Sequence, residues 1–194
     1  MRHKRKLYSI TGERYEQIKE SVADMYEDLG YTEIPINVFE LCHRLNIKLI
    51  RYSALSVNCA EYSRRFSDDG FNLLNVNTMQ YQVYYNDLMP QERITFTIMH
   101  EIGHIMLDHK THDEKDEHEA NFFAKTALAP LGLIYRLKLK NSFEIAETFG
   151  VSFEFAENIV RYYNKSMIFP SICEREANSR LVELFFKNYM EVAS

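Results

Sequence analysis

The chain of 194 residues is long enough for one domain with a substantial hydrophobic core, and its composition excludes disordered and fibrous classes. Its net charge of -5 argues against broad binding to nucleic acid or to an anionic membrane, because both require a basic surface. No apolar stretch reaches the roughly 18 residues of a membrane-spanning helix, and no signal peptide is expected, because no apolar segment follows the basic residues 2–6. The three cysteines are odd in number and far apart, which favours a reducing, cytoplasmic compartment over a disulfide framework.

The first half of the chain is predicted to form two helices followed by a small sheet. Apolar residues at a helical period predict a helix over 15–29 that ends at Gly30, a residue common just after a helix. Asn37 and Glu40 resemble a capping pair at the start of a second helix. Four strands are expected, at 47–52, 60–66, 71–76 and 81–86. Residues 68–70, Asp-Asp-Gly, are interpreted as the turn of a hairpin between the second and third of these strands.

The second half is predicted to be helical throughout. After Pro90 a long helix is expected over 91–108, and after a polar break another from about 114 to 128. The predicted fold class is therefore α+β, mostly helical with a small, largely antiparallel sheet. No linker rich in Gly or Ser divides the chain, so the boundary between residues 1–130 and a C-terminal helical region, 131–194, is expected to be soft.

Residues 100–104, within the predicted helix 91–108, have the sequence His-Glu-Ile-Gly-His. Positions i and i+4 share one face of a helix, so His100 and His104 can bind one metal ion together. Glu101 is rotated by about 100° from His100, where it can accept a proton from a metal-bound water without binding the metal. The helix is apolar on nearly every side, and burying these groups unpaired would cost several kcal/mol. The motif therefore predicts a site for one Zn²⁺ ion, with two ordinary core histidines as the weaker alternative.

A third protein ligand is required if one coordination position is to stay open for water. His109 does not have the spacing of the third histidine in a metzincin-type motif, which would fall one position later. Glu117 continues the inward stripe of the next helix toward the site, whereas Glu119 is offset and expected in solvent with the rest of the charged run 109–119. Glu117 is therefore favoured as a metal ligand, with Glu119 as the alternative, and Asn121 is expected to hydrogen-bond a ligand from one turn away. Small side chains are expected to let the two helices approach closely, at Gly103, Ala120 and Ala124.

The predicted strand 81–86, which mixes aromatic and polar residues, comes directly before the metal motif. As an exposed edge strand it could pair with an extended substrate and place the scissile carbonyl near the metal, with Tyr84 and Tyr85 in contact with the substrate. An ordinary sheet strand is the alternative.

Residues 146–152 resemble the turn of a helix-turn-helix. A recognition helix needs basic side chains to face phosphates and bases, and the second helix here carries Glu154 and Glu157, with only Arg161 as a basic residue near its end. Direct DNA binding is therefore not expected. A packing hairpin, or a surface that recognises a protein substrate, is favoured.

Five segments together form a pattern that is more specific than the metal motif alone. They are Ile-Pro-Ile-Asn-Val at 34–38, Tyr-Tyr-Asn at 84–86, Phe-Thr-Ile-Met-His-Glu-Ile-Gly-His-Ile-Met-Leu at 96–107, Glu-His-Glu-Ala-Asn-Phe-Phe-Ala at 117–124 and Leu-Ala-Pro at 128–130. On these segments the chain resembles the ImmA/IrrE metallo-endopeptidases from about residue 34 to 161. Only the Leu-Ala-Pro segment departs from the family's pattern, where Leu-Met-Pro is common, and this change is conservative.

The resemblance implies a compact, thermolysin-like zincin fold. It implies His100, His104 and Glu117 as zinc ligands and Glu101 as the catalytic base. It also implies that the substrate is a protein, typically a DNA-binding repressor carried by a mobile element or involved in a stress response. A tyrosine or histidine of the chain is expected to stabilise the oxyanion.

The predicted function is thus a cytoplasmic, site-specific zinc endopeptidase that cleaves a repressor or similar regulatory protein. The alternative is a non-catalytic module of the same fold that controls a repressor or a toxin partner by contact. The intact motif favours the enzyme, because a protein that only binds its partner does not need Glu101.

Overall fold

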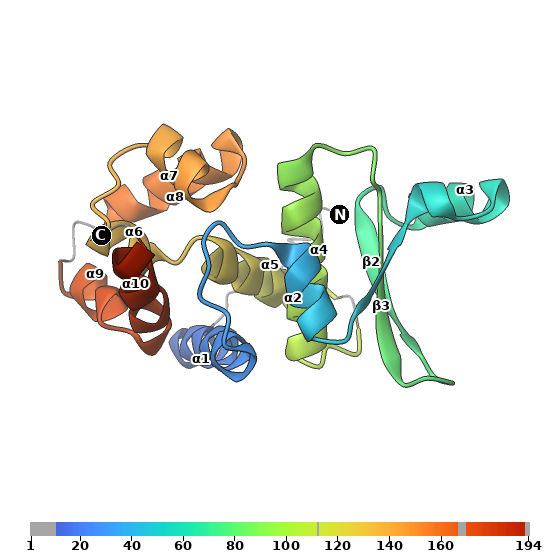
Figure 1. Cartoon of the computed structure of the whole chain (residues 1–194), viewed down its shortest axis with the longest axis horizontal. Helices are drawn as coiled ribbons and strands as arrows, with labels where there is room; N and C mark the ends of the chain where they lie inside the picture. The colour runs from blue at the N-terminus through green and yellow to red at the C-terminus, as the bar shows by residue number, and fades with distance from the viewer. Residues whose placement is uncertain (1–10, 112, 167–169, 193–194) are drawn as a thin grey trace, which may run out of the picture.

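The computed structural model describes residues 11–111, 113–166 and 170–192, most of which lie in helices (Figure 1). The helices are α1 (Gly12–Leu29), α2 (Val38–Arg44), α3 (Val57–Phe66), α4 (Gln91–Met106), α5 (Glu114–Leu128), α6 (Leu131–Arg136), α7 (Ser142–Phe149), α8 (Phe153–Ser166), α9 (Pro170–Ala177) and α10 (Arg180–Val192). The strands are β1 (Lys48–Arg51), β2 (Gly70–Asn75) and β3 (Gln80–Tyr85). The α+β class expected from the sequence is confirmed.

The sheet has the strand order β1-β3-β2, with β3 parallel to β1 and antiparallel to β2. It is therefore a mixed sheet in which β2 and β3 form a hairpin, and the turn of that hairpin lies at residues 76–79. The prediction that residues 81–86 form an exposed edge strand is wrong, because β3 pairs with a neighbour on both sides. Within the described part of the chain, β1 and β2 are the two edge strands of this sheet.

The segment expected as a strand at 60–66 is instead the helix α3. Ser56 begins this helix, and its hydroxyl accepts a hydrogen bond from the main-chain N–H of Cys59. The buried residues Ala60 and Ser63 are three positions apart and so share one face of the helix. The hairpin predicted across residues 68–70 is therefore absent, and Gly70 is the first residue of β2.

The centre of the molecule is the pair α4 and α5, with the sheet on one side and α1 on the other (Figure 1). Most residues of α4 are buried, as its apolar sequence predicts. A Cβ atom on Gly103 would lie 3.2 Å from the carbonyl oxygen of Ala120 and 3.2 Å from Cβ of Phe123. The expectation that small residues allow α4 and α5 to approach closely is therefore confirmed at Gly103.

The C-terminal helices pack on the same core as the first part of the chain. Phe185 of α10 contacts Tyr26 of α1 edge to face, with ring centroids 4.9 Å apart, and both side chains are fully buried. Phe155 of α8 contacts Phe96 of α4 at 5.8 Å, which places α8 beside the metal motif. The division of the chain near residue 130 stays a prediction. Among the described residues, no helix combines the length and the apolar character needed to cross a lipid bilayer.

Candidate metal centre

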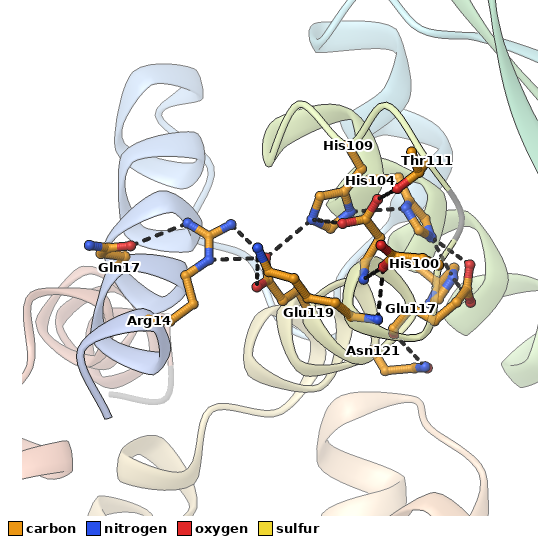
Figure 2. A network of polar contacts seen from close by, with 12 residues as sticks. Arg14, Gln17, His100, His104, His109, Thr111, Glu117, Glu119 and Asn121 are labelled. Atoms are coloured by element: carbon orange, nitrogen blue, oxygen red, sulfur yellow. Dashed lines mark hydrogen bonds and ion pairs between the residues drawn. The ribbon is translucent and has the colours of Figure 1, made fainter. Parts of the chain in front are cut away.

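Three side chains from two helices meet at the contact between α4 and α5 (Figure 2). His100 and His104 lie one turn apart on α4, and their Nε2 atoms are 3.0 Å apart. Glu117, in the first turn of α5, places one carboxylate oxygen 3.4 Å from Nε2 of His100 and the other 3.4 Å from Nε2 of His104. A donor atom from each of the three lies within 4.8 Å of the others. The structure thus brings together the three residues that the sequence suggested as metal ligands.

The position of Glu117 follows from how α5 begins. Asp113 caps this helix, and its carboxylate accepts hydrogen bonds from the main-chain N–H groups of Lys115 at 2.9 Å and Asp116 at 3.0 Å. These hydrogen bonds, foremost the one from Asp116, hold the pKa of Asp113 below its ordinary value. A carboxylate is favourable at this end of a helix because the exposed N–H groups carry partial positive charge. The cap therefore fixes the first turn, which carries Glu117 toward the two histidines.

The chemistry of these side chains fits a divalent metal ion. Hydrogen bonds from His100 and then His104 hold the pKa of Glu117 well below its usual range, so its carboxylate is ionised at neutral pH. Two imidazoles and a carboxylate are a donor set that zinc and similar metals take in proteins. Nε2 of His100 and Nε2 of His104 both face the carboxylate of Glu117, which is the arrangement that a shared metal ion requires and that two independent core histidines do not.

Glu101 lines the same cavity but is not one of the three residues whose donor atoms converge. Its residue surface is 5% exposed, and one of its carboxylate oxygens accepts a hydrogen bond of 2.6 Å from the amide of Asn72. Asn72 lies on β2, so a residue of the edge strand holds the carboxylate in place. No local sequence pattern indicates this role for Asn72, because the two residues are 29 positions apart.

A cavity of about 410 Å³ opens over this group of residues. The cavity is lined by His100, Glu101, Glu117 and Asn121, and also by the aromatic rings of Phe66, Phe71 and Phe96. The arrangement leaves space for a water molecule and a peptide segment beside the metal-binding atoms and Glu101.

The remaining candidate residues lie at the border of this site. The amide of Asn121 donates a hydrogen bond of 2.7 Å to the main-chain carbonyl of Glu117 and so supports the turn that carries this residue (Figure 2). Tyr84 and Tyr85 lie on the central strand, and neither lines the cavity. The ring of Tyr84 stacks on that of Phe71 at 5.0 Å, so Tyr84 supports the cavity wall from behind.

A model of the IrrE N-terminal-like domain, the peptidase family M78, matches residues 42–160. The chain belongs to this family. The family resemblance of the sequence is thereby confirmed, and the family indicates a metallopeptidase-type hydrolase that depends on a metal. The matched residues include all three metal-site side chains and Glu101. A search of curated proteins finds no match.

In this M78-family chain His104 also contacts a second group of polar residues, which includes His109, Glu119 and Arg14 (Figure 2). Nδ1 of His104 is 3.0 Å from Nδ1 of His109, and Nε2 of His109 is 3.3 Å from a carboxylate oxygen of Glu119. The same oxygen accepts hydrogen bonds of 3.0 and 2.6 Å from Nε and an Nη atom of Arg14, which lies on α1.

The expectation that the charged run 109–119 is solvated is therefore wrong for its buried members. Glu119 is 0% exposed, and Asp116 is also buried. A carboxylate is buried only where partners replace its hydration, and Glu119 finds them in Arg14 and His109. Glu119 does lie off the metal-facing side of α5, as expected from the apolar stripe of this helix. The side of α5 on which it lies is covered by α1 and is not in solvent.

The titration of these buried groups reflects competition between burial and hydrogen bonding. Burial lowers the pKa of His109, although Glu119 and Asp116 act in the opposite direction. For Glu119, burial acts to raise the pKa, but hydrogen bonds from Arg14 and His109 outweigh it, so this pKa lies below its ordinary value. A neutral His109 beside an ionised Glu119 is the state that both directions favour.

Proposed function

We propose that this protein is a zinc-dependent endopeptidase that cleaves a regulatory protein in the cytoplasm. The observation that carries the proposal is the convergence of His100, His104 and Glu117 next to a separate, buried carboxylate, Glu101, in the wall of an open cavity. Two histidines and one glutamate are the protein donors of thermolysin-type zinc sites, which supports zinc as the ion.

The polar residues at the cavity have separate roles in the proposed hydrolysis. His100, His104 and Glu117 would hold the zinc ion, which would lower the pKa of a bound water towards about 7 and would polarise the carbonyl oxygen of the substrate. Glu101 is placed to accept a proton from the water that attacks the peptide carbonyl and to donate it to the leaving amine. Asn72 holds Glu101 at the position from which it serves both steps.

The substrate is an extended segment of a protein. β2 pairs only with β3 in the described sheet, and two of its residues, Gly70 and Phe71, line the cavity. A segment that adds to this strand by main-chain hydrogen bonds would carry its scissile bond past Glu101. The aromatic side chains of Phe66, Phe71 and Phe96 favour an apolar side chain near that bond. The similarity to ImmA/IrrE peptidases supports a DNA-binding repressor as the protein that supplies the segment.

The test is the substitution Glu101→Gln, which keeps the shape of the side chain and its contact with Asn72 but removes the base. We expect the variant to retain one metal ion per chain by elemental analysis and to lose peptide hydrolysis by about 10²–10⁴-fold. The control is Glu92→Gln, at an exposed carboxylate in the first turn of the same helix, which should behave as wild type.

The assay uses a peptide library read by mass spectrometry and, as a protein substrate, any DNA-binding regulator found to be encoded beside this chain's gene. Undiminished cleavage by Glu101→Gln would overturn the assignment of the base. A wild-type protein that binds the regulator and its metal yet cleaves neither substrate would favour the alternative, a module that acts by contact.

A further inference from the structure

His104 uses both of its ring nitrogens. Nε2 faces His100 and Glu117, where the metal is expected, and Nδ1 faces Nδ1 of His109 at 3.0 Å. His104 is also the most buried of the three candidate ligands, with a side chain 2% exposed. The orientation of its ring is therefore set by protein contacts and not by water.

The end of α4 explains why His109 lies against His104. Asp108 adopts a left-handed conformation, with φ of 53°, and reverses the chain just after the helix. The main-chain N–H of His109 then donates to the carbonyl of His104 at 3.0 Å, and that of Asp108 donates to the carbonyl of Ile105 at 3.2 Å. This pair of hydrogen bonds is the Schellman arrangement, and it brings His109 back over the last turn of α4.

A metal on His104 at one end and the donor Arg14 at the other end determine which atom donates in each hydrogen bond between them. A metal on Nε2 of a neutral His104 leaves the ring proton on Nδ1, so Nδ1 of His109 must accept it. A neutral His109 that accepts at Nδ1 carries its own proton on Nε2 and donates it to Glu119. Arg14 can only donate, and it donates to the same carboxylate oxygen. Every donor in the series thus has an acceptor in one consistent arrangement.

The last residue in this series of hydrogen bonds is Arg14, which lies on a different helix from the three candidate ligands. Arg14 lies on α1, 105 residues from Glu119 in the sequence, and contacts its carboxylate through two nitrogen atoms (Figure 2). The second oxygen of Glu119 faces the ammonium group of Lys115 at 3.8 Å. Arg14 therefore supplies the charge-assisted hydrogen bonds that hold the buried carboxylate.

We propose that His109 and Glu119, anchored by Arg14, are positioning residues that hold His104 in the tautomer and orientation required for metal binding. The proposal rests on the proposed function, because it requires a metal on His104. Partners that hydrogen-bond the non-ligating nitrogen of a ligand histidine typically change metal affinity by about 10–100-fold. The affinity of the site for its metal therefore depends on α1, whose Arg14 is hydrogen-bonded to Glu119.

The experiment measures the affinity for Zn²⁺ by competition with a chromophoric chelator, and the visible absorption of the protein loaded with Co²⁺. We expect His109→Phe, which fills the ring space without an acceptor, to weaken binding by about 10–100-fold. His109→Asn places an amide oxygen near the position of Nδ1 and should recover part of that loss. The Co²⁺ absorption should change in both variants at saturating metal, because the orientation of His104 changes.

Two matched pairs test the rest of the series. Glu119→Gln should weaken Zn²⁺ binding, whereas Glu114→Gln, at an exposed carboxylate in the first turn of the same helix, should not. Arg14→Gln should weaken binding, and Arg14→Lys should recover part of it because the positive charge remains. Arg14 has a side chain 30% exposed, so its replacement decides the question if the buried variants fail to fold by circular dichroism.

Three outcomes separate this inference from the proposed function. Weaker binding with altered Co²⁺ absorption in the folded variants, and unchanged binding in Glu114→Gln, supports the inference. Wild-type affinity and absorption in His109→Phe, Glu119→Gln or Arg14→Gln overturns it and leaves the peptidase assignment intact. A wild-type protein that binds neither Zn²⁺ nor Co²⁺ overturns both.

Discussion

Glu117 and Glu119 lie on the same helix but on opposite sides of the histidine pair, and their surroundings differ. Glu117 and Glu119 are two positions apart on α5, which turns their side chains by about 200° relative to each other. The side chain of Glu117 is 43% exposed and faces the cavity, whereas that of Glu119 is 1% exposed and faces Arg14. Each carboxylate approaches a histidine, and each has its pKa held below the ordinary value by the groups around it.

The difference shows how one helix can serve both as a source of ligands and as their support. On the cavity side, accessible space is kept beside Glu117 and Glu101 for water and substrate. On the opposite side, the polar groups are buried and hydrogen-bonded to one another, which restricts motion of His104. The first side is arranged for exchange with solvent and the second for rigidity. Substitutions on the two sides should therefore differ in which quantity they change more, the metal affinity or the stability of the metal-free protein.

The largest expected effect separates the two glutamates. Glu117→Gln should weaken metal binding by more than the ~10–100-fold cost of an outer contact, because it removes a ligand. It should lower the stability of the metal-free protein less than Glu119→Gln does, since the side chain is 43% exposed and solvent screens its contacts with the two histidines. Glu119→Gln should lower the free energy of unfolding of the metal-free protein by about 1–3 kcal/mol, because Arg14 and His109 lose an ionised acceptor.

Chemical denaturation of the metal-free proteins and chelator competition measure these two quantities separately. The comparison between the two sides fails if Glu117→Gln is the less stable variant and Glu119→Gln the weaker metal binder.

Local sequence patterns predicted the cavity side of this site and not the buried side. The spacing of His100 and His104 and the inward stripe that leads to Glu117 depend only on helix periodicity, which a sequence carries within a few residues. The contacts of Arg14 with Glu119 and of Asn72 with Glu101 join residues that are 105 and 29 positions apart. No local pattern pairs such residues, so only the packing of helices and strands identifies them.

The errors in the predicted sheet have a similar origin. The central position of β3 arises from a parallel pairing with β1, which comes from a separate part of the chain. An alternation of side chains along β3 cannot show how many neighbours the strand has. The helix α3 was a different kind of error, because a local signal existed. Ser56 is a good first residue for a helix, and the strand assignment at 60–66 overlooked it.

A smaller effect is expected where α4 and α5 touch, between the two sides. Gly103→Ala would place a Cβ atom 3.2 Å from the carbonyl oxygen of Ala120, so the helices must move apart by a few tenths of an ångström. Overpacking costs about 1–3 kcal/mol and the better helix propensity of alanine returns about 1, for a net loss of up to about 2 kcal/mol. Metal affinity should fall as well, because Glu117 moves away from the histidines.

The matched control is Gly12→Ala at the start of α1, where a Cβ atom would meet nothing within 4 Å. Thermal unfolding and chelator competition on both variants provide the measurement. Equal behaviour of the two variants would show that the approach of α4 to α5 tolerates an added methyl group, and that the metal site does not depend on it.

The smallest effect concerns the substrate side of the cavity alone. Phe66 and Tyr62 are both on α3 and are 71% and 72% exposed, but only Phe66 lines the cavity. Phe66→Ala should raise KM for a peptide with an apolar side chain near the scissile bond by roughly fivefold, the equivalent of about 1 kcal/mol of apolar contact. It should leave stability and metal affinity unchanged, because the ring is exposed and contacts none of the ligands.

Tyr62→Ala removes an equally exposed ring from the same helix and should leave KM as in the wild type. Steady-state kinetics with one peptide and both variants compares them directly. An equal rise in KM for the two would indicate that the substrate spreads over the whole outer face of α3, and no change in either would place the apolar substrate side chain elsewhere in the cavity. Either result would change which residues are assigned to the substrate contact. Neither would change the roles of the buried residues, since Phe66 and Tyr62 lie on a helix that does not carry Glu119 or Arg14.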